Sequence, residues 1–322
     1  MLPEVRAWLR DRTTVAADWP VPAVVAAKGT ARVSVVLPAC NERRTVGAIV
    51  AAIRGSLMEA QPLVDEIVVI DSRSTDNTAR VAAAAGARVF AQDEVLAHLR
   101  PESGKGEALW KSLAVTTGDL IVFLDADVRN FSASFVTGLL GPLLAEPDVS
   151  FVKASYDRPL GGTADSGGRV TELVARPLIN LHWPLLAGLV QPLSGEYAAR
   201  REAIERVPFV TGYGVELGLL VDLLEARGLA AMAQVDLGTR VHRHQGTAAL
   251  GRMSSQIMLT AWSRLQRHGL IVASQEPAEV LAQFRRGEGA HDVDLSDISV
   301  AQRPPMIEIA EYVSARLLAA DA

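Results

Sequence analysis

Short apolar runs alternate with longer stretches of helical spacing through the first half of the chain. The runs are rich in valine, isoleucine and leucine, which is typical of buried strands. Between the first two runs, Val46, Ile49, Val50 and Ile53 recur at the spacing of one helix face. The predicted strands of this half are Arg32–Leu37, Ile67–Ile70, Arg88–Phe90 and Leu120–Leu124. Strands that alternate with helices in this way predict an α/β fold around a mostly parallel sheet.

Residues at the ends of the predicted helices help to place their boundaries. Asp76 is a good N-cap for a helix through Ala85, and Gly86 sits where a glycine commonly ends a helix. Another helix is expected over Asn130–Ala145, with an interruption near Pro142, because proline lacks a backbone donor.

The second half of the chain continues the alternation with longer loops. Val149–Lys153 and Met232–Leu237 are expected strands, and Val215–Ala226 and Ala248–His268 are expected helices. Residues 275–305 are polar and are predicted to form a loop.

The two ends of the chain are predicted to be simple. A short helix over Pro3–Arg12 is followed by Pro20 and Pro22, which are expected to break the chain. Met306–Leu318 is expected to form a last helix.

Composition and charge exclude several kinds of partner. Of 322 residues, 49% are hydrophobic and 21% are charged, as in ordinary globular proteins, and the net charge is −5. Such a chain has no general basic surface for nucleic acid or an anionic membrane, so an anionic ligand must be held by local positive charge. The one cysteine, Cys40, fits a reducing compartment, and we expect a cytoplasmic protein. No apolar run reaches the roughly 18 residues of a membrane span, and no signal peptide is apparent.

Two carboxylates follow the most apolar of the predicted strands. Asp125 and Asp127 come directly after Leu120–Leu124. Ligands of open α/β sheets bind at the carboxyl ends of the strands, where the repulsion of two acids is relieved by a cation such as Mg²⁺. The pattern therefore indicates a site for a metal ion and a diphosphate, although two acids on a solvated turn give the same pattern.

Other polar segments converge on the same edge of the predicted sheet. The loops that begin at Pro38 and at Asp71 follow strands of the same direction. Lys105 lies between two glycines at a helix start, which suits a phosphate, but its spacing is not that of a Walker loop. Glu216, in the first turn of its helix, is a candidate partner for a sugar hydroxyl, although a first-turn glutamate is also favourable to the helix itself.

Basic side chains in the second half are candidates for an anion site. Arg169 follows two glycines and precedes Thr171, and Arg240 lies close to His242, which is a possible third ligand beside Asp127. Solvated surface arginines and an ordinary surface histidine are the plainer interpretation.

Several longer motifs resemble known enzymes. The segments 35–42, 71–76 and 125–127 resemble the nucleotide-binding half of the GT-A glycosyltransferases. The segments 104–110, 167–178, 191–197 and 212–216, with Arg303–Met306, resemble the actinobacterial glucosyl-3-phosphoglycerate synthases and the related mannosyl-3-phosphoglycerate synthases. The resemblance covers roughly residues 32–270 and again the Arg303–Met306 segment.

The resemblance implies a retaining transfer of a hexose from a nucleotide sugar to the C2 hydroxyl of D-3-phosphoglycerate, in a cytoplasmic homodimer that uses Mg²⁺ or Mn²⁺. It implies a GT-A type sheet with a lead-in over residues 1–31, a nucleotide-sugar-binding half over 32–153, an acceptor-binding α/β half over 154–270 and a helical tail over 271–322.

The resemblance also assigns roles residue by residue. The expected donor-binding residues are Pro38, Ala39, Cys40, Glu42, Asp71, Ser72, Arg73, Lys105, Asp125, Ala126, Tyr213 and Glu216. The expected acceptor-binding residues are Gly168, Arg169, Thr171, Arg240 and His244. Asp127 and His242 are the expected metal ligands, and Asp127, Glu216 and Lys105 the expected catalytic residues.

Four positions depart from the mycobacterial pattern, namely Cys40, Arg73, Ala126 and His244. Arginine pairs with guanine O6 and N7, as it does in DNA grooves, and has no such pair on uracil. Arg73 therefore favours GDP-mannose over UDP-glucose as the donor, and glucose transfer from UDP-glucose or GDP-glucose, or the use of more than one donor, stays open.

Two other functions remain open at this point. An inverting GT-A transferase would act on a polysaccharide or lipid acceptor, but such enzymes commonly carry membrane segments. A non-catalytic nucleotide-sugar-binding protein would keep Asp125 and Asp127 without needing the set of Arg169, Thr171, Arg240 and His242.

Overall fold

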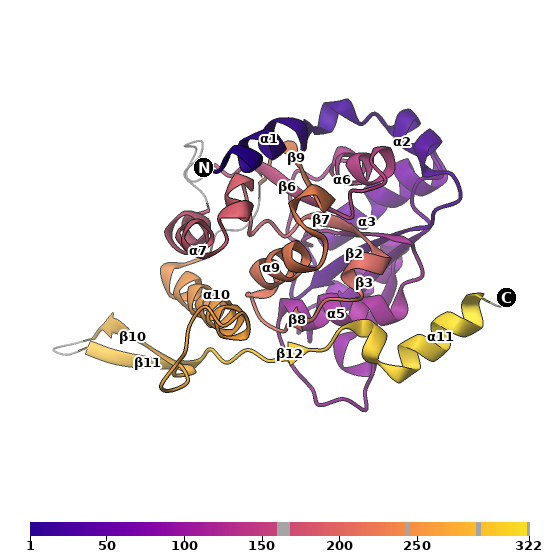
Figure 1. Ribbon diagram of the computed structural model, residues 1–322. Coiled ribbons are helices and arrows are strands. Elements are labelled where there is room, and N and C mark those ends of the chain that lie inside the picture. Colours follow the sequence, from indigo (N-terminus) through magenta and orange to yellow (C-terminus); the bar gives the residue numbers. More distant parts are fainter. Residues whose placement is uncertain (160–167, 242–244, 288–290, 321–322) are drawn as a thin grey trace.

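An eight-stranded sheet runs through the centre of the protein (Figure 1). The structure is a computed structural model that describes residues 1–159, 168–241, 245–287 and 291–320. The strands lie in the order β1-β9-β6-β7-β5-β2-β3-β4, and all neighbours are parallel except at β7, which is antiparallel to β5 and β6. Their bounds are Thr13–Val15 (β1), Val33–Ala39 (β2), Glu66–Asp71 (β3), Arg88–Ala91 (β4), Leu120–Phe123 (β5), Phe151–Asp157 (β6), Tyr197–Arg200 (β7) and Met232–Thr239 (β9). The prediction of a mostly parallel α/β sheet is confirmed.

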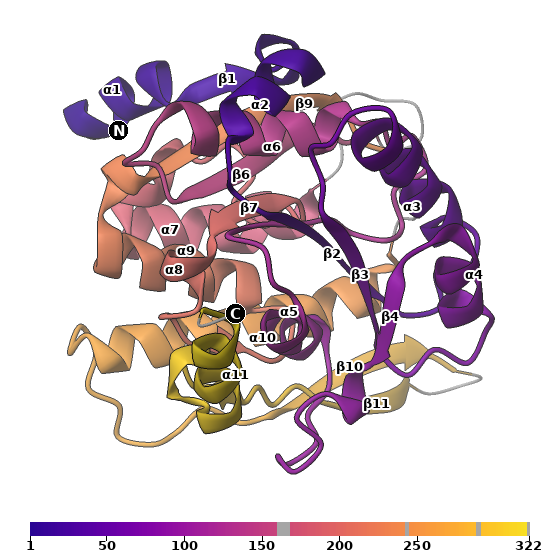
Figure 2. The same ribbon diagram turned by 90° about the vertical axis from the view of Figure 1, so that its right-hand side faces the viewer.

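Helices cover both faces of this sheet (Figure 2). They span Pro3–Asp11 (α1), Val21–Lys28 (α2), Val46–Arg54 (α3), Thr78–Ala85 (α4), Lys105–Val115 (α5), Ser134–Ala145 (α6), Arg176–His182 (α7), Arg201–Ile204 (α8), Val215–Arg227 (α9), Thr247–Arg267 (α10) and Ala310–Ala320 (α11). Val122 packs with the core under α2, α3 and α6, whereas its neighbour Phe123 packs with the core under α5 and α9. Successive strand residues point to opposite faces, so β5 serves both cores.

The predicted helix ends are mostly confirmed. Gly86 has a φ of +107°, the left-handed conformation that a glycine at a helix end adopts. Asp76 Oδ1 accepts the backbone N–H of Thr78 at 2.9 Å, although the N-cap position itself is Asn77. The prediction for Pro142 is wrong, because α6 starts at Ser134 and continues through the proline to Ala145.

The first 31 residues form more than a lead-in. β1 pairs in parallel with β9 and so adds an edge strand to the sheet. Pro20 and Pro22 were predicted to break the chain, but they begin α2. The first turn of a helix has no internal acceptor for its N–H groups, so proline costs nothing there. The domain boundaries at 31, 153 and 270 stay a prediction.

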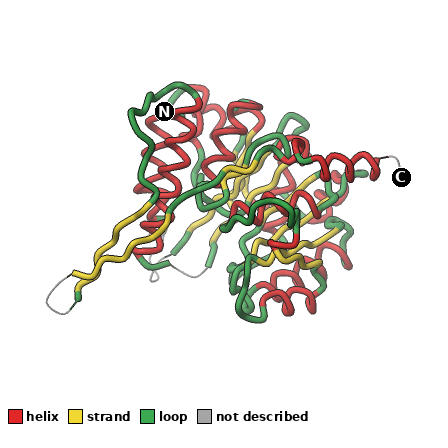
Figure 3. The backbone as a smooth tube through the Cα atoms, turned by 90° about the horizontal axis from the view of Figure 1, so that it is seen from below, coloured by secondary structure: helices red, strands yellow, loops and turns green. Residues whose placement is uncertain are grey.

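The prediction of a loop over residues 275–305 is wrong. Val280–Arg286 (β10) and His291–Asp297 (β11) pair as an antiparallel hairpin, and Gln302–Arg303 (β12) pairs with Phe209–Val210 (β8). Figure 3 shows the hairpin extending away from the body of the protein. The alternation of Val280, Ala282 and Phe284 was the available signal, but it is short and lies within polar sequence. Among the described residues no helix is long and apolar enough to cross a membrane.

The start of α5 packs too closely against β8 for any side chain at Gly106. A Cβ there would lie 1.7 Å from the carbonyl oxygen of Val210. Gly106→Ala is therefore expected to lower the free energy of unfolding by about 1–3 kcal/mol, measured by urea denaturation. Gly55→Ala is the control, because Gly55 has helical dihedral angles and open space around its Cβ position. Equal unfolding midpoints for the two variants would contradict this packing.

Candidate active site

A cavity of about 710 Å³ opens at the carboxyl ends of β2, β5 and β6. Its walls come from the segments that follow these strands, from the first turns of α5 and α9, and from one side of α10. The strand ends meet there because β2, β3 and β5 are parallel and adjacent. This is the edge at which the sequence predicted a ligand.

Most of the predicted site residues line this cavity. They are Pro38, Ala39, Cys40, Glu42, Ser72, Lys105, Asp125, Ala126, Asp127, Gly168, Arg169, Thr171, Tyr213, Glu216 and Arg240. Asp71 and Arg73 are not among the lining residues, and His242 and His244 lie outside the described residues. Residues more than 200 positions apart in the sequence thus share one cavity wall.

Arg240, just beyond β9, links the acids at the centre of the cavity. One of its terminal nitrogens lies 2.8 Å from Asp125 Oδ2 and 2.9 Å from Asp127 Oδ1. Its Nε lies 2.9 Å from Glu196 Oε1, as an ion pair without hydrogen-bond alignment. The guanidinium also stacks 5.5 Å from the ring centroid of Tyr156. Arg240 is buried, so these contacts are shielded from water.

The pKa values of the two aspartates shift in opposite directions. Burial would raise the pKa of Asp125, but the charges of Lys105 and Arg240 outweigh it and hold that pKa below its usual range. Burial raises the pKa of Asp127, and the negative charge of Asp125 adds to this effect against the opposing charge of Arg240. Asp125 is therefore the firmly ionised member of the pair.

Lys105, the first residue of α5, contacts Asp125 after β5 and Glu216 in the first turn of α9. Its Nζ lies 2.6 Å from Asp125 Oδ1 and 2.8 Å from Glu216 Oε1. Burial opposes the charge of Lys105, but Asp125 and Glu216 raise its pKa well above the usual value for lysine. Both carboxylates of this set thus have a permanent cation beside them.

An ion pair from the far end of the chain fixes the first turn of α5. Arg303 donates to both carboxylate oxygens of Glu107 at 2.7 Å and stacks 5.2 Å from the ring centroid of Trp110. Glu107 is fully buried. Two of the segments that carried the family resemblance therefore contact each other, and the contact holds the helix that presents Lys105.

The structure gives Arg73 a different partner from the predicted guanine base. Its Nε and one terminal nitrogen lie 2.7 and 2.9 Å from the two oxygens of Asp93, and it also donates to the carbonyl of Glu102. The residue has a positive φ of 59° and points its guanidinium at Asp93 instead of the cavity. The argument that Arg73 selects GDP-mannose therefore has no support in the structure.

The predicted anion-binding residues that the structure describes line the same cavity as the acids. Gly168, Arg169 and Thr171 line the cavity, and Arg169 donates to the carbonyl oxygen of Gln245 at 3.0 Å. Arg158 lies just beyond β6 and also lines the cavity. It donates to Tyr156 Oη at 2.8 Å. Positive side chains thus face the cavity from several elements.

Sequence reasoning missed Arg158, Tyr156 and Glu196. Glu196 is fully buried, accepts from Tyr156 Oη and is paired with Arg240. Arg158 follows a strand, which is the positional signal that identified Asp125, but it is separated from the predicted strand Val149–Lys153 by four residues. Glu196 lies in segment 191–197, which carried the family resemblance, but no role was assigned to it, and for Tyr156 the sequence held no signal of a shared site.

The acids suit a divalent cation. Among the described residues no group of three or more His, Cys, Asp and Glu side chains forms a metal site, and His242 lies outside them. Asp125 and Asp127 nevertheless present hard oxygen donors to the cavity, with a guanidinium balancing their charge. One or two carboxylates plus substrate phosphates are the usual ligands of Mg²⁺.

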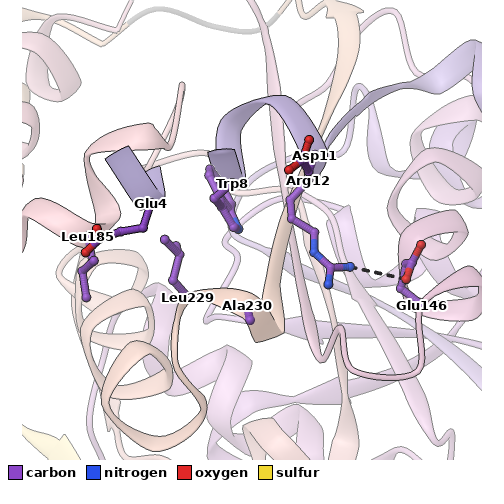
Figure 4. A pocket seen from close by; sticks show the side chains of 8 residues that line it. All are labelled: Glu4, Trp8, Asp11, Arg12, Glu146, Leu185, Leu229 and Ala230. Carbon is purple, nitrogen blue, oxygen red and sulfur yellow. Dashed lines mark ion pairs between the residues drawn. The ribbon is translucent and has the colours of Figure 1, made fainter. Parts of the chain in front are cut away.

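A second hollow of about 540 Å³ lies beside α1, and none of the predicted site residues lines it (Figure 4). Trp8, Glu4, Arg12 and Glu146 belong to its walls, with Arg12 and Glu146 3.5 Å apart. Trp8 donates to the carbonyl of Met232, the first residue of β9, so this hollow is at the edge opposite the carboxyl ends of the strands.

Comparison with known proteins agrees with this geometry. The profile of Glycosyl transferase family 2 matches residues 34–207. The glucosyl-3-phosphoglycerate synthase of Mycolicibacterium paratuberculosis is 45% identical over 306 residues, which cover 93% of this chain and 91% of the relative. That of Petrotoga mobilis is 42% identical over 289 residues, covering 88% and 89%.

Solved structures give the same assignment. The mannosyl-3-phosphoglycerate synthase of Rubrobacter xylanophilus superposes with a TM-score of 0.89 at 41% identity, covering 94% of this chain and 99% of that one. The glucosyl-3-phosphoglycerate synthase of Mycobacterium tuberculosis, in complex with Mn²⁺, UDP and phosphoglyceric acid, gives a TM-score of 0.80 at 44% identity, covering 89% and 94%. The chain therefore belongs to glycosyl transferase family 2 and, within it, to the glucosyl-3-phosphoglycerate and mannosyl-3-phosphoglycerate synthases.

Proposed function

We propose that this protein transfers a hexose, with retention of configuration, from a nucleotide diphosphate sugar to the C2 hydroxyl of D-3-phosphoglycerate. The observation that carries the proposal is one cavity that is lined both by the acids of the strand end and by the arginines Arg158, Arg169 and Arg240. The acids suit a metal-bound diphosphate, and the arginines suit a small, highly charged acceptor. The M. tuberculosis relative has been solved with UDP-glucose, Mn²⁺ and phosphoglyceric acid together.

The donor occupies the part of the cavity formed by Pro38 to Glu42, Ser72 and Lys105. Lys105 contacts Asp125 at the acidic strand end and suits a diphosphate oxygen or a sugar hydroxyl. Tyr213 and Glu216 line the place of the hexose. With Arg73 bound to Asp93, UDP-glucose, GDP-glucose and GDP-mannose all stand as candidate donors.

Asp127 and His242 hold Mg²⁺ or Mn²⁺ in this proposal. The bound ion supplies positive charge against the departing diphosphate. Relatives solved with Mn²⁺ or with Mg²⁺ and UDP support this choice of ions. The burial of Asp127 beside Asp125 supports the need for a cation at this point.

Arg158, Arg169 and Arg240 bind the acceptor, together with Gly168, Thr171 and the predicted His244. 3-Phosphoglycerate carries a phosphate and a carboxylate, and arginine matches both groups with paired donors. Because the chain as a whole has a net charge of −5, this local wall is what attracts the anion.

The transfer proceeds on the face of the leaving group. The C2 oxygen of the acceptor forms its bond to the anomeric carbon as the bond to the diphosphate breaks, and the hydroxyl proton passes to the departing phosphate. Asp125 and Glu216 are both engaged by Lys105, which argues against either as a covalent nucleophile. Catalysis then rests on positioning and on charge stabilisation.

We also propose that the protein is cytoplasmic. We further propose that it is a homodimer whose two subunits pair through the hairpin β10–β11. Phe284 lies opposite Val293, and Ala282 lies opposite Leu295, so these side chains share one face of the hairpin. Phe284 and Leu295 are 67% and 66% exposed, and a lone two-stranded hairpin is only marginally stable in water. A second copy that covers this face would stabilise both hairpins.

The function is tested by a donor panel. UDP-glucose, GDP-glucose and GDP-mannose are each incubated with 3-phosphoglycerate and Mg²⁺ or Mn²⁺, and the product is analysed by NMR. At least one donor is expected to give a phosphorylated α-hexoside, and EDTA is expected to abolish turnover. Binding of donors without any transfer would leave a nucleotide-sugar-binding protein, and a β-linked product or a trapped glycosyl-enzyme would overturn the retaining mechanism.

Arg169 provides a test of the acceptor wall. Arg169→Gln is expected to raise the KM for 3-phosphoglycerate at least tenfold, about 1.4 kcal/mol or more, because a charge-assisted contact is lost. The donor KM should stay unchanged. The control is Arg176→Gln, since Arg176 pairs with Glu172 and does not line the cavity. Equal effects of the two substitutions would contradict the assignment.

The dimer is tested by sedimentation. Wild-type protein is expected to sediment as a dimer, and the double variant Phe284→Ser with Leu295→Ser as a monomer. Val272→Ser is the control, because Val272 is 97% exposed but does not belong to the hairpin. A monomeric wild type, or a dimeric double variant, would exclude this interface.

A further inference from the structure

Lys153 is a buried lysine that the proposed mechanism does not use. It lies on β6, is 1% exposed and is directly opposite Tyr197 of β7. Its Nζ is 4.6 Å from the ring centroid of Tyr197 and 5.9 Å from that of Phe151, and it has no hydrogen-bond partner among the described residues. Tyr197 Oη is also without a partner there. Such a group is costly to keep in a core.

The surroundings of Lys153 connect it to the active site. The charged groups that act on it are Glu216 of α9, Lys105 of α5, Glu196 before β7 and Asp125 after β5. Burial lowers the pKa of Lys153 to about 7, and the three carboxylates oppose this decrease. Lys153 does not line the cavity, but Tyr197, the residue opposite it on β7, directly follows Glu196, which pairs with Arg240.

Charges in the linked set of side chains balance only when Lys153 is counted. Asp125, Asp127, Glu196 and Glu216 are connected through Lys105 and Arg240. Arg158 adds a third cation, because its charge acts on Asp125. Among these side chains alone, before a bound divalent cation is counted, four carboxylates stand against three cations and leave one negative charge.

We propose that Lys153 is a positioning residue that supplies the fourth positive charge of this set and so keeps Glu216 and Asp125 arranged for the anionic donor. The inference rests on the proposed function. It assigns Lys153 a role through its neighbours, without contact to either substrate. The cation–π contact with Tyr197 holds the ammonium at that depth.

A role in packing alone makes a different prediction about activity. If Lys153 served only to fill space, its replacement by an apolar side chain of similar length would cost nothing in activity. Because its ammonium is buried and unpaired, removing the charge should also stabilise the fold. Loss of activity together with a gain in stability is thus the signature of a functional charge.

The test compares Lys153→Met with Lys111→Met. Lys111 is the matched control, because it is equally buried but has partners, donating to the carbonyl of Gln92 at 2.9 Å and lying 3.4 Å from Glu107. Lys153→Met is expected to raise Tm, and Lys111→Met to lower it. In the folded state the pKa of Lys153 lies below that of an exposed lysine, so the gain should be larger at pH 7 than at pH 9.

The kinetic measurement uses whichever sugar nucleotide the donor panel identifies, at saturating 3-phosphoglycerate. Lys153→Met is expected to lower kcat/KM for the donor at least tenfold, and Lys111→Met to leave it unchanged. In the wild type, kcat/KM should fall as the pH rises past about 7, where Lys153 loses its proton, and this decrease should be absent in Lys153→Met. Deprotonation of a ligating histidine has the opposite sign, so the two effects are separable.

Two results would overturn the inference. One is a Lys153→Met variant with wild-type kcat/KM and pH profile. The other is a loss of Tm in Lys153→Met like that of Lys111→Met, which would make Lys153 a structural residue. The thermal measurement needs no substrate, so it stands apart from the donor panel, whose failure would concern the proposed function alone.

Discussion

The contact between Arg240 and three carboxylates is the constraint on which the active site depends. Asp125, Asp127 and Glu196 come from the ends of β5 and the start of β7, and a buried cation must lie among them for all to remain charged. Arg240 arrives from the end of β9, on the other side of β6 and β7. One side chain therefore joins the end of β9 to the acidic end of β5 and the start of β7.

The helices that line the cavity are likewise held by pairs of opposite charge. Lys105 and Glu216 each sit in the first turn of a helix and pair with each other. The turn that carries Lys105 is held from behind by Gly106 against β8 and by the buried pair of Glu107 with Arg303. A residue near the end of the chain thus supports the helix turn that presents Lys105 without lining the cavity itself.

Both the sequence and the fold show which family the chain belongs to. Neither shows which hexose is transferred. A glucosyl-3-phosphoglycerate synthase is 45% identical to this chain, and a mannosyl-3-phosphoglycerate synthase is 41% identical. Arg73, which the sequence predicted to contact the donor's guanine base, is instead paired with Asp93. Selection of the donor therefore depends on the cavity wall itself.

The sequence alone was sufficient for the parallel strands, for the acids after β5 and for most of the cavity lining, because these follow from local periodicity and from the rule that parallel strand ends share an edge. It was not sufficient for partners that meet only after folding. The directions of Arg73 and Arg240, the buried position of Lys153, and the pairing of β1 with β9 and of β10 with β11 depend on contacts between segments far apart in the chain or weakly patterned. The direction of a charged side chain depends on which opposite charge the tertiary structure places near it. Residue type and spacing along the sequence do not specify the distance between two such charges.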